Sequence, residues 1–158
     1  MLRLNKKTEY ALLALRYLGR TDPDAEPSAL APGIHASARE IATWYNIPEG
    51  LLAKVLQGLK RLGVLTATKG GRGGYRLGRP LSQVPLLQIL TAFSGEPGLV
   101  ECISDNHDTC AQARQCDIKG PLEVLNRAVM QPLQRMSVQD LFIGETRQDT
   151  PRMFSIMS

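Results

Sequence analysis

Residues 37–63 read Ser37-Ala-Arg-Glu-Ile-Ala-Thr-Trp-Tyr-Asn-Ile-Pro-Glu-Gly-Leu-Leu-Ala-Lys-Val-Leu-Gln-Gly-Leu-Lys-Arg-Leu-Gly63. Ser37 and Glu40 have the spacing of a capping box, which predicts the start of a short helix. Asn46-Ile-Pro48 ends that helix, and Pro48 suits the first turn of a second one. Apolar residues then recur at helical spacing up to Gly63, a helix stop. Two helices joined by a tight turn predict a helix-turn-helix.

The residues that follow this pair of helices predict a β-hairpin. Residues 64–68 and 73–77 read as strands, and Lys69-Gly-Gly-Arg72 lies between them. Glycine lets a hairpin tip approach a sugar-phosphate edge closely, and Arg72 can enter a minor groove. We therefore interpret the hairpin as the wing of a winged helix-turn-helix. An ordinary hairpin without a ligand is the alternative. A phosphate-binding loop is disfavoured because the Gly-Lys-Ser/Thr ending is missing.

The rest of the chain predicts a mainly α-helical protein in which this hairpin is the only β-structure. Helices are expected over residues 6–18, 82–93 and from Pro121 to Met136, with a kink or restart at Pro132 and one short turn capped by Ser137 and Asp140. Residues 21–36 read as an exposed loop. The expected organisation is a winged helix-turn-helix domain over 1–80, a linker helix, cysteine loop and dimerisation helix over 81–143, and a flexible tail over 144–158.

The last long helix carries an apolar stripe that needs a partner. The stripe consists of Leu122, Leu125, Val129, Leu133 and Met136. It suits a helix that packs across a dimer, and the pattern alone equally allows a helix that covers its own domain.

Charge divides the chain into two unlike halves. Residues 1–80 hold 13 Lys and Arg against 6 Asp and Glu, whereas residues 81–158 hold 6 against 9. A basic half beside an acidic one favours nucleic-acid binding by the first, although a solvated surface gives the same bias. No apolar run reaches the ~18 residues of a membrane span, and no signal peptide is recognisable. We expect a cytoplasmic protein without a membrane partner.

The three cysteines of the chain cluster on one polar segment. Seven residues separate Cys102 from Cys110, and five separate Cys110 from Cys116. Thiolates select zinc, copper(I) or iron–sulfur clusters, but three ligands are one short of a closed site. The fourth ligand must come from elsewhere in the chain, a second chain or a small molecule. His107 lies in the same segment and is a candidate, although a lone loop histidine is more often solvated.

These segments resemble one known group of regulators. Ala38-Arg-Glu-Ile-Ala42, Tyr45-Asn-Ile-Pro48, Leu52 to Gly63 and Lys69-Gly-Gly-Arg-Gly-Gly-Tyr-Arg-Leu77 are similar to the winged-helix regulators that include IscR, NsrR and RirA. Leu2 to Ala11 is similar to their opening helix. The resemblance implies a homodimeric transcription factor, and not an enzyme, that binds a double-stranded DNA operator. Many such proteins carry an iron–sulfur cluster that senses iron, nitric oxide or redox state.

The resemblance also implies which residues act. The cysteine spacing is closest to RirA-like repressors, and Lys119 stands where IscR-like proteins have a histidine, so a four-iron cluster is favoured over a two-iron one. Cys102, Cys110 and Cys116 would hold it, with Glu9 of the partner subunit as the fourth ligand. The expected DNA-binding residues are Glu49, Lys54, Gln57, Lys60, Arg61, Lys69, Arg72 and Tyr75.

Three alternatives remain at this point. A cluster-free regulator could switch by forming a disulfide. A zinc-binding structural or interaction protein would use the same thiols. An enzyme with Cys110 as its nucleophile is disfavoured, because no histidine or carboxylate pairing supports it.

Overall fold

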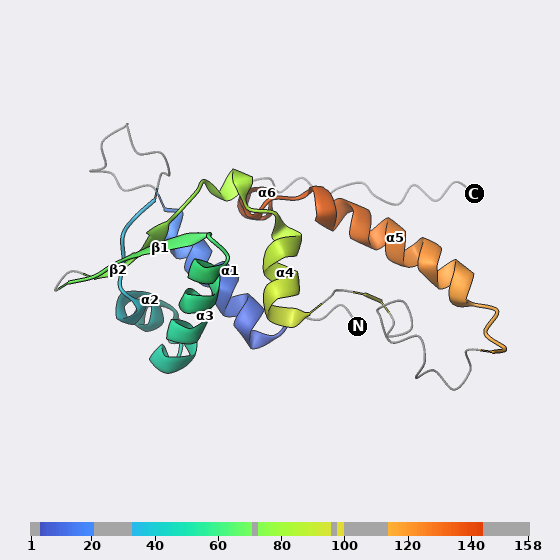
Figure 1. The fold of residues 1–158 in the computed structure, drawn as a ribbon, viewed down its shortest axis with the longest axis horizontal. Helices are drawn as coiled ribbons and strands as arrows, with labels where there is room; N and C mark the ends of the chain where they lie inside the picture. The colour runs from blue at the N-terminus through green and yellow to red at the C-terminus, as the bar shows by residue number, and fades with distance from the viewer. Residues whose placement is uncertain (1–3, 21–32, 71–72, 96–97, 100–113, 144–158) are drawn as a thin grey trace.

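The computed structural model describes residues 4–20, 33–70, 73–95, 98–99 and 114–143. In chain order the elements are α1 (Lys6–Leu18), α2 (Ala38–Tyr45), α3 (Glu49–Arg61), β1 (Leu65–Thr68), β2 (Gly74–Leu77), the 3-10 turn η1 (Leu81–Gln83), α4 (Leu86–Ser94), α5 (Lys119–Arg135) and α6 (Val138–Ile143). The hairpin and α5 project from opposite sides of a helical body (Figure 1). The predicted class, mainly helical with a small hairpin, is confirmed.

The helix-turn-helix forms where its capping residues place it. The Ser37 hydroxyl accepts from the Glu40 amide at 3.2 Å, and the Glu40 carboxylate accepts from the Ser37 amide at 2.6 Å. Asn46 then ends α2 in the left-handed conformation, with φ 52°. Asparagine tolerates that conformation better than most residues. The reversal buries Ile47 and lets α3 start immediately after Pro48.

The hairpin is antiparallel and is extended by a third segment. Leu65 pairs with Leu77, and both are buried, so this end of the hairpin is fixed to the core. Tyr75 exchanges two backbone hydrogen bonds with Ala36, at 2.8 and 3.0 Å. A Cβ on Gly74 would lie 2.6 Å from the Ala36 carbonyl oxygen, so only glycine allows this close approach.

One hydrophobic core joins the helix-turn-helix to elements further along the chain. α1 lies at its centre and contacts α2, α3, α4 and β2. The core also contains Val84, Ile89 and Val138, which come from the second half of the sequence. The division at residue 80 that we predicted, with separate units on either side, stays a prediction.

The predicted helix over residues 82–93 is wrong at its beginning. Residues 81–83 form a 3-10 turn, Val84 is extended, and the helix starts only after Pro85. A proline disfavours helical geometry at the residue before it, which explains the break. The Val84 carbonyl instead accepts from the Val138 amide at 2.9 Å, and the Leu86 amide donates to the Met136 carbonyl at 2.9 Å. These bonds attach the end of α5 to the start of α4.

α5 differs from every other long helix because none of its residues is buried. Val124 is 64% exposed and Leu125 52% exposed, while Leu133 packs partly against the core. The helix continues through Pro132 to Arg135 without a restart. Ser137 and Asp140 cap α6 as predicted, with the Ser137 amide 2.8 Å from the Asp140 carboxylate. No helix of the described segments combines the length and the apolar character that crossing a bilayer requires.

Candidate nucleic-acid interface

α3 has two faces, and its polar face is turned to solvent. Leu52, Val55, Leu56 and Leu59 are buried against the body. Lys54, Gln57 and Arg61 lie on the opposite side and are exposed. Their spacing of three and four residues places them in one row along the helix. Glu49 and Lys60 are also exposed and lie beside this row.

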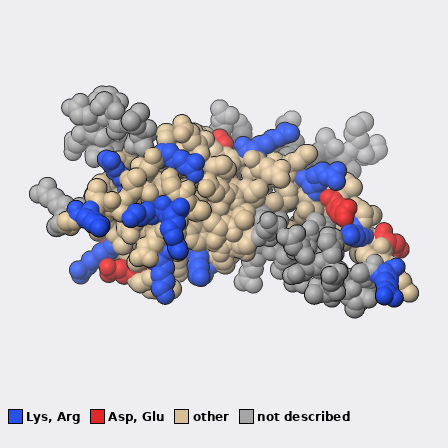
Figure 2. Space-filling view, in the orientation of Figure 1, with Lys and Arg blue, Asp and Glu red and all other residues tan. Residues whose placement is uncertain are grey.

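The charges around α3 are mostly positive. Lys and Arg side chains gather over the body that carries α1 to α4 and the hairpin, and few acidic side chains interrupt them on this face (Figure 2). Such a surface attracts a polyanion through its summed field. The exposed row on α3 therefore lies within a cationic surface, as a DNA-reading helix requires.

The structure describes only some of the predicted wing residues. Lys69 is exposed beside the hairpin tip, whereas Arg72 lies outside the described residues. Tyr75 is half-buried and packs against the core, so at least part of its ring has a structural role. Sequence reasoning did not single out His35, whose Nε2 lies 2.7 Å from the Thr68 hydroxyl. This contact braces the hairpin near its tip.

The candidate cluster ligands are only partly described. Cys102, Cys110 and His107 lie outside the described residues. Cys116 is a free, half-buried cysteine three residues before α5. Within the described ranges, no three or more His, Cys, Asp or Glu side chains come together as a metal site. The structure therefore places one of the three thiols.

Glu9 has a partner in its own protomer. Lys6 Nζ lies 2.6 Å from the Glu9 carboxylate, and this hydrogen bond raises the pKa of Lys6. The Glu9 side chain is 40% exposed, so it remains accessible to another group. A metal ion or cluster would have to compete with Lys6 for this carboxylate.

A polar clamp joins the start of α1 to the end of α4, and sequence reasoning missed it. The Asn5 side-chain amide donates to the Phe93 carbonyl at 2.6 Å. Thr8 is fully buried, and its hydroxyl lies 2.6 Å from the Ser94 hydroxyl. The two ends are 86 and 88 residues apart in sequence, so no local pattern could have paired them.

Comparisons with known proteins agree with this arrangement. Residues 4–143 match the sequence profile of Rrf2, described as "Iron-dependent Transcriptional regulator". The chain belongs to the Rrf2 family. It is 30% identical over 145 residues to the HTH-type transcriptional regulator NsrR of Shouchella clausii, covering 91% of each chain. Rrf2 relatives of this kind are transcriptional regulators and not enzymes, so the predicted regulator is confirmed at that level.

Solved structures share the fold at lower identity. CymR, the global cysteine regulator of B. subtilis, aligns with a TM-score of 0.63 and 22% identity, over 89% of this chain and 96% of CymR. T. potens IscR aligns with a TM-score of 0.59 and 17% identity, over 94% and 93%. These two solved structures carry different names and share the fold of this chain. The shared fold therefore establishes the winged helix, and the sensing chemistry has to be inferred from the residues of this chain.

Proposed function

We propose that this Rrf2 protein is a homodimeric DNA-binding repressor whose operator affinity is controlled by an iron–sulfur cluster. The observation that carries the proposal is the group of three cysteines, Cys102, Cys110 and Cys116, within a chain whose described part is a winged helix with an exposed cationic reading helix. Because a regulator of this kind acts on the chromosome, the proposal includes a cytoplasmic location.

The DNA-binding part of the proposal rests on α3 and the hairpin. Lys54, Gln57 and Arg61 form the exposed row that would enter a major groove, with Glu49 and Lys60 beside it. Lys69 and Arg72 would serve the wing, and Tyr75 would contribute through its exposed part. Arginine and lysine contacts to phosphate supply most of the affinity, while side chains on the row supply selectivity.

The dimer part rests on α5. None of the 17 residues of α5 is buried by the described part of the chain, and only the C-terminal end of its apolar stripe, at Leu133 and Met136, packs against the core. The rest of the stripe consists of Leu122 and Val129, which are half-buried, and Leu125, which is 52% exposed. A second copy of α5 would cover it and would give the two-fold pair of reading helices that a palindromic operator needs.

The cluster part rests on the chemistry of the donor set. Three thiolates suit iron–sulfur ligation, and Cys116 is a free thiol at the foot of α5. A fourth, oxygen ligand from Glu9 of the partner subunit would make a four-iron cluster easier to displace at one iron, because carboxylate is a harder ligand than thiolate. When bound, the cluster supplies a redox- and iron-sensitive cross-link of this segment. The chain's own part is to supply three thiolates from the segment that lies between α4 and α5 in the sequence.

A cluster-free thiol switch is the second candidate. The free Cys116 thiol favours it, and CymR among the structural neighbours fits it as well as IscR fits the cluster. Protein isolated without oxygen distinguishes the candidates. The cluster predicts broad visible absorption with stoichiometric iron and sulfide, and loss of both on replacing any of the three cysteines by Ala.

A colourless protein whose DNA affinity changes on disulfide formation would instead support the thiol switch. Stoichiometric zinc, with DNA affinity unaffected by oxidant, would support the structural zinc protein and contradict both.

A further inference from the structure

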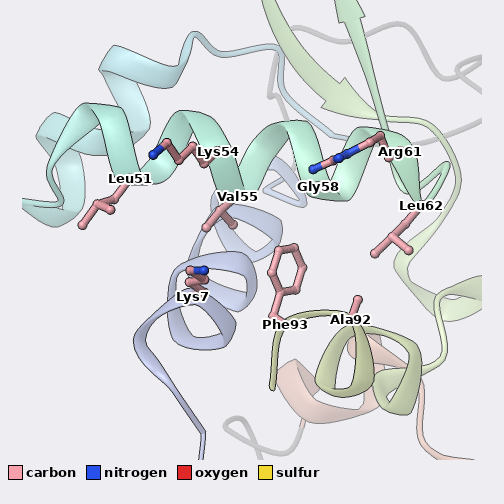
Figure 3. A pocket seen from close by; sticks show the side chains of 9 residues that line it. All are labelled: Lys7, Leu51, Lys54, Val55, Gly58, Arg61, Leu62, Ala92 and Phe93. Atoms are coloured by element: carbon pink, nitrogen blue, oxygen red, sulfur yellow. The ribbon is translucent and has the colours of Figure 1, made fainter. Parts of the chain in front are cut away.

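A groove lies beside α3, the proposed recognition helix, and is bounded by α1, α3 and α4. We call it the α1–α3–α4 groove. It has a volume of about 390 Å³ and is lined by Lys7 of α1, by Leu51, Lys54, Val55, Gly58, Arg61 and Leu62 of α3, and by Ala92 and Phe93 of α4. Figure 3 shows Phe93 rising from α4 towards Gly58, which closes the floor of the groove at that point.

The lining has a simple chemical pattern. Among the described residues that line the groove, three are cationic and the others are apolar or glycine; none is acidic. Lys54 and Arg61 approach from α3, and Lys7 faces them from α1 (Figure 3). Like charges around one groove repel each other unless an anion lies between them. The groove therefore suits an anion whose remaining surface is apolar.

The position of Lys7 is fixed by the polar clamp. Asn5 caps α1 through the Thr8 amide at 2.9 Å and also donates to the Phe93 carbonyl. The Thr8–Ser94 hydrogen bond lies one residue beyond Lys7. Lys7 is thus carried on a helix turn that is bonded directly to the α4 wall of the groove.

We propose that the α1–α3–α4 groove holds one sugar-phosphate strand of the DNA, with Lys7 as a phosphate contact that extends the interface beyond the helix-turn-helix and the wing. This inference rests on the proposed DNA-binding function. The groove shares Lys54 and Arg61 with the exposed row of α3, so it borders the surface that would enter the major groove. In DNA, a sugar-phosphate strand runs along each edge of the major groove.

The DNA strand also fits the apolar part of the lining. Deoxyribose presents C–H surface between charged phosphates, and Leu51, which is 48% exposed, can pack against it. A small organic acid would satisfy the same chemistry at one point only. The groove is open and continuous with the cationic face of α3, which favours a polymer that contacts both.

The test compares two neighbouring lysines. Lys7→Gln removes the cation that lines the groove, and Lys6→Gln removes one whose amine pairs with Glu9 and does not line the groove. Both change the net charge equally, so long-range attraction falls equally. Binding of the full-length dimer to a mixed-sequence duplex of about 30 base pairs is measured by anisotropy over a range of salt concentrations. The visible spectrum verifies equal cluster content.

We expect Lys7→Gln to weaken binding by roughly five-fold at low salt and to reduce the slope of log K against log salt by about 0.9, because one phosphate contact is lost. Lys6→Gln should leave that slope unchanged. A gain-of-function pair rules out misfolding: Ala92→Lys adds a cation inside the groove and should tighten binding and steepen the slope. Thr91→Lys, which adds the same charge next to the groove, should do so less.

Equal effects of the two lysine variants, or none from Lys7→Gln, would overturn the inference. If Lys7→Gln has no effect but Lys54→Gln flattens the salt dependence of DNA binding, the proposed DNA-binding function stands and the groove assignment alone fails. Octanoate is the probe for a small acid. If millimolar octanoate raises the melting temperature of the wild type but not of Lys7→Gln, while Lys7→Gln binds DNA normally, the groove is a small-ligand site.

Discussion

The helical body and α5 are stabilised in opposite ways. α1 and α3 each bury four or more side chains inside one protomer, whereas α5 is longer than either and buries none. The body therefore has the contacts that a folded unit needs by itself, whereas the described residues leave Leu125 of the α5 stripe exposed, and the proposed dimer would cover it. The difference indicates that folding of one protomer sets the recognition surface, and in the proposed dimer association would set the relative position of two such surfaces.

The largest expected effect tests the body. Leu15 of α1 is fully buried in the core. Leu15→Ala should lower the free energy of unfolding by about 3 kcal/mol, through lost transfer energy and the cavity left behind. Urea unfolding at several protein concentrations measures it. Leu125→Ala is the matched change on α5, where the side chain is 52% exposed. Its effect should depend on protein concentration, because only the dimer is weakened. A loss independent of concentration in Leu125→Ala would place that side chain in the protomer core.

The next prediction tests the association directly. Leu125→Glu should give folded monomers that bind an operator poorly, because a buried carboxylate in a helix–helix interface is strongly unfavourable. Val124→Glu is the control, since Val124 is 64% exposed and lies about 100° around the helix from Leu125. Sedimentation or light scattering gives the oligomeric state. Two variants that behave alike would mean that the apolar stripe is not the contact surface.

Glu9 of the body is the proposed fourth cluster ligand, contributed across the dimer. If Glu9 is a cluster ligand, Glu9→Gln should change the visible spectrum of the holo protein and accelerate cluster decay. If Glu9 is only a first-turn carboxylate that interacts favourably with the helix dipole, its loss should lower the stability by about 0.3–1 kcal/mol and leave the spectrum unchanged. Lys6→Gln serves as the control, because it removes the 2.6 Å ion pair while it keeps the carboxylate. An unchanged spectrum in Glu9→Gln would assign the fourth position to another ligand.

Sequence reasoning predicted the body better than its connections, and the reason is physical. The capping boxes at Ser37 and Ser137, the turn at Asn46 and the glycine-rich hairpin depend on interactions within a few residues, so the pattern contains them. Pro85 breaks the helix locally, but the hydrogen bond that Val84 makes instead has its donor at Val138, which is far away in sequence. The helical periodicity of residues 86–93 continued backwards past Pro85 and concealed the break.

The candidate site divides in the same manner. The exposed row on α3 follows from helical spacing and was predicted. The groove lined by Lys7 required the docking of α1 on α4 through Asn5 and Thr8, which no periodicity reveals. The spacing of the cysteines could name ligands for a cluster, but a ligand from a second chain could be proposed only through resemblance.

The two capping boxes allow a finer comparison, because one starts the helix-turn-helix and the other starts α6 after α5. Ser37→Ala should lower the stability by about 1 kcal/mol, since it leaves the Glu40 amide without its capping acceptor. Ser137→Ala removes the equivalent bond to the Asp140 amide from a helix of only six residues. We expect the smaller loss there, because fewer residues depend on that cap. Thermal unfolding of both variants gives the order, and a larger loss from Ser137→Ala would show that the α4–α5 junction contributes more to the body than α2 does.

The smallest expected effect is the pH dependence of these same boxes. The Ser37 backbone amide, and after it the Ser37 hydroxyl, lowers the pKa of Glu40 in the folded protein, and the Ser137 amide and hydroxyl do the same for Asp140. A lowered folded-state pKa means that the unfolded chain binds the proton more readily, so stability falls as the pH drops. The contribution is fully present above the ordinary carboxyl pKa of about 4 and disappears as the pH falls through the lower, folded-state value.

Glu40→Gln and Asp140→Asn keep an oxygen acceptor and remove the charge. Each should therefore be less stable than the wild type at neutral pH and should approach it in acid. Urea unfolding between neutral and acid pH measures that difference. A difference that stays constant with pH would show that the two carboxylates act by shape and hydrogen bonding, and that their charge contributes nothing to either helix start.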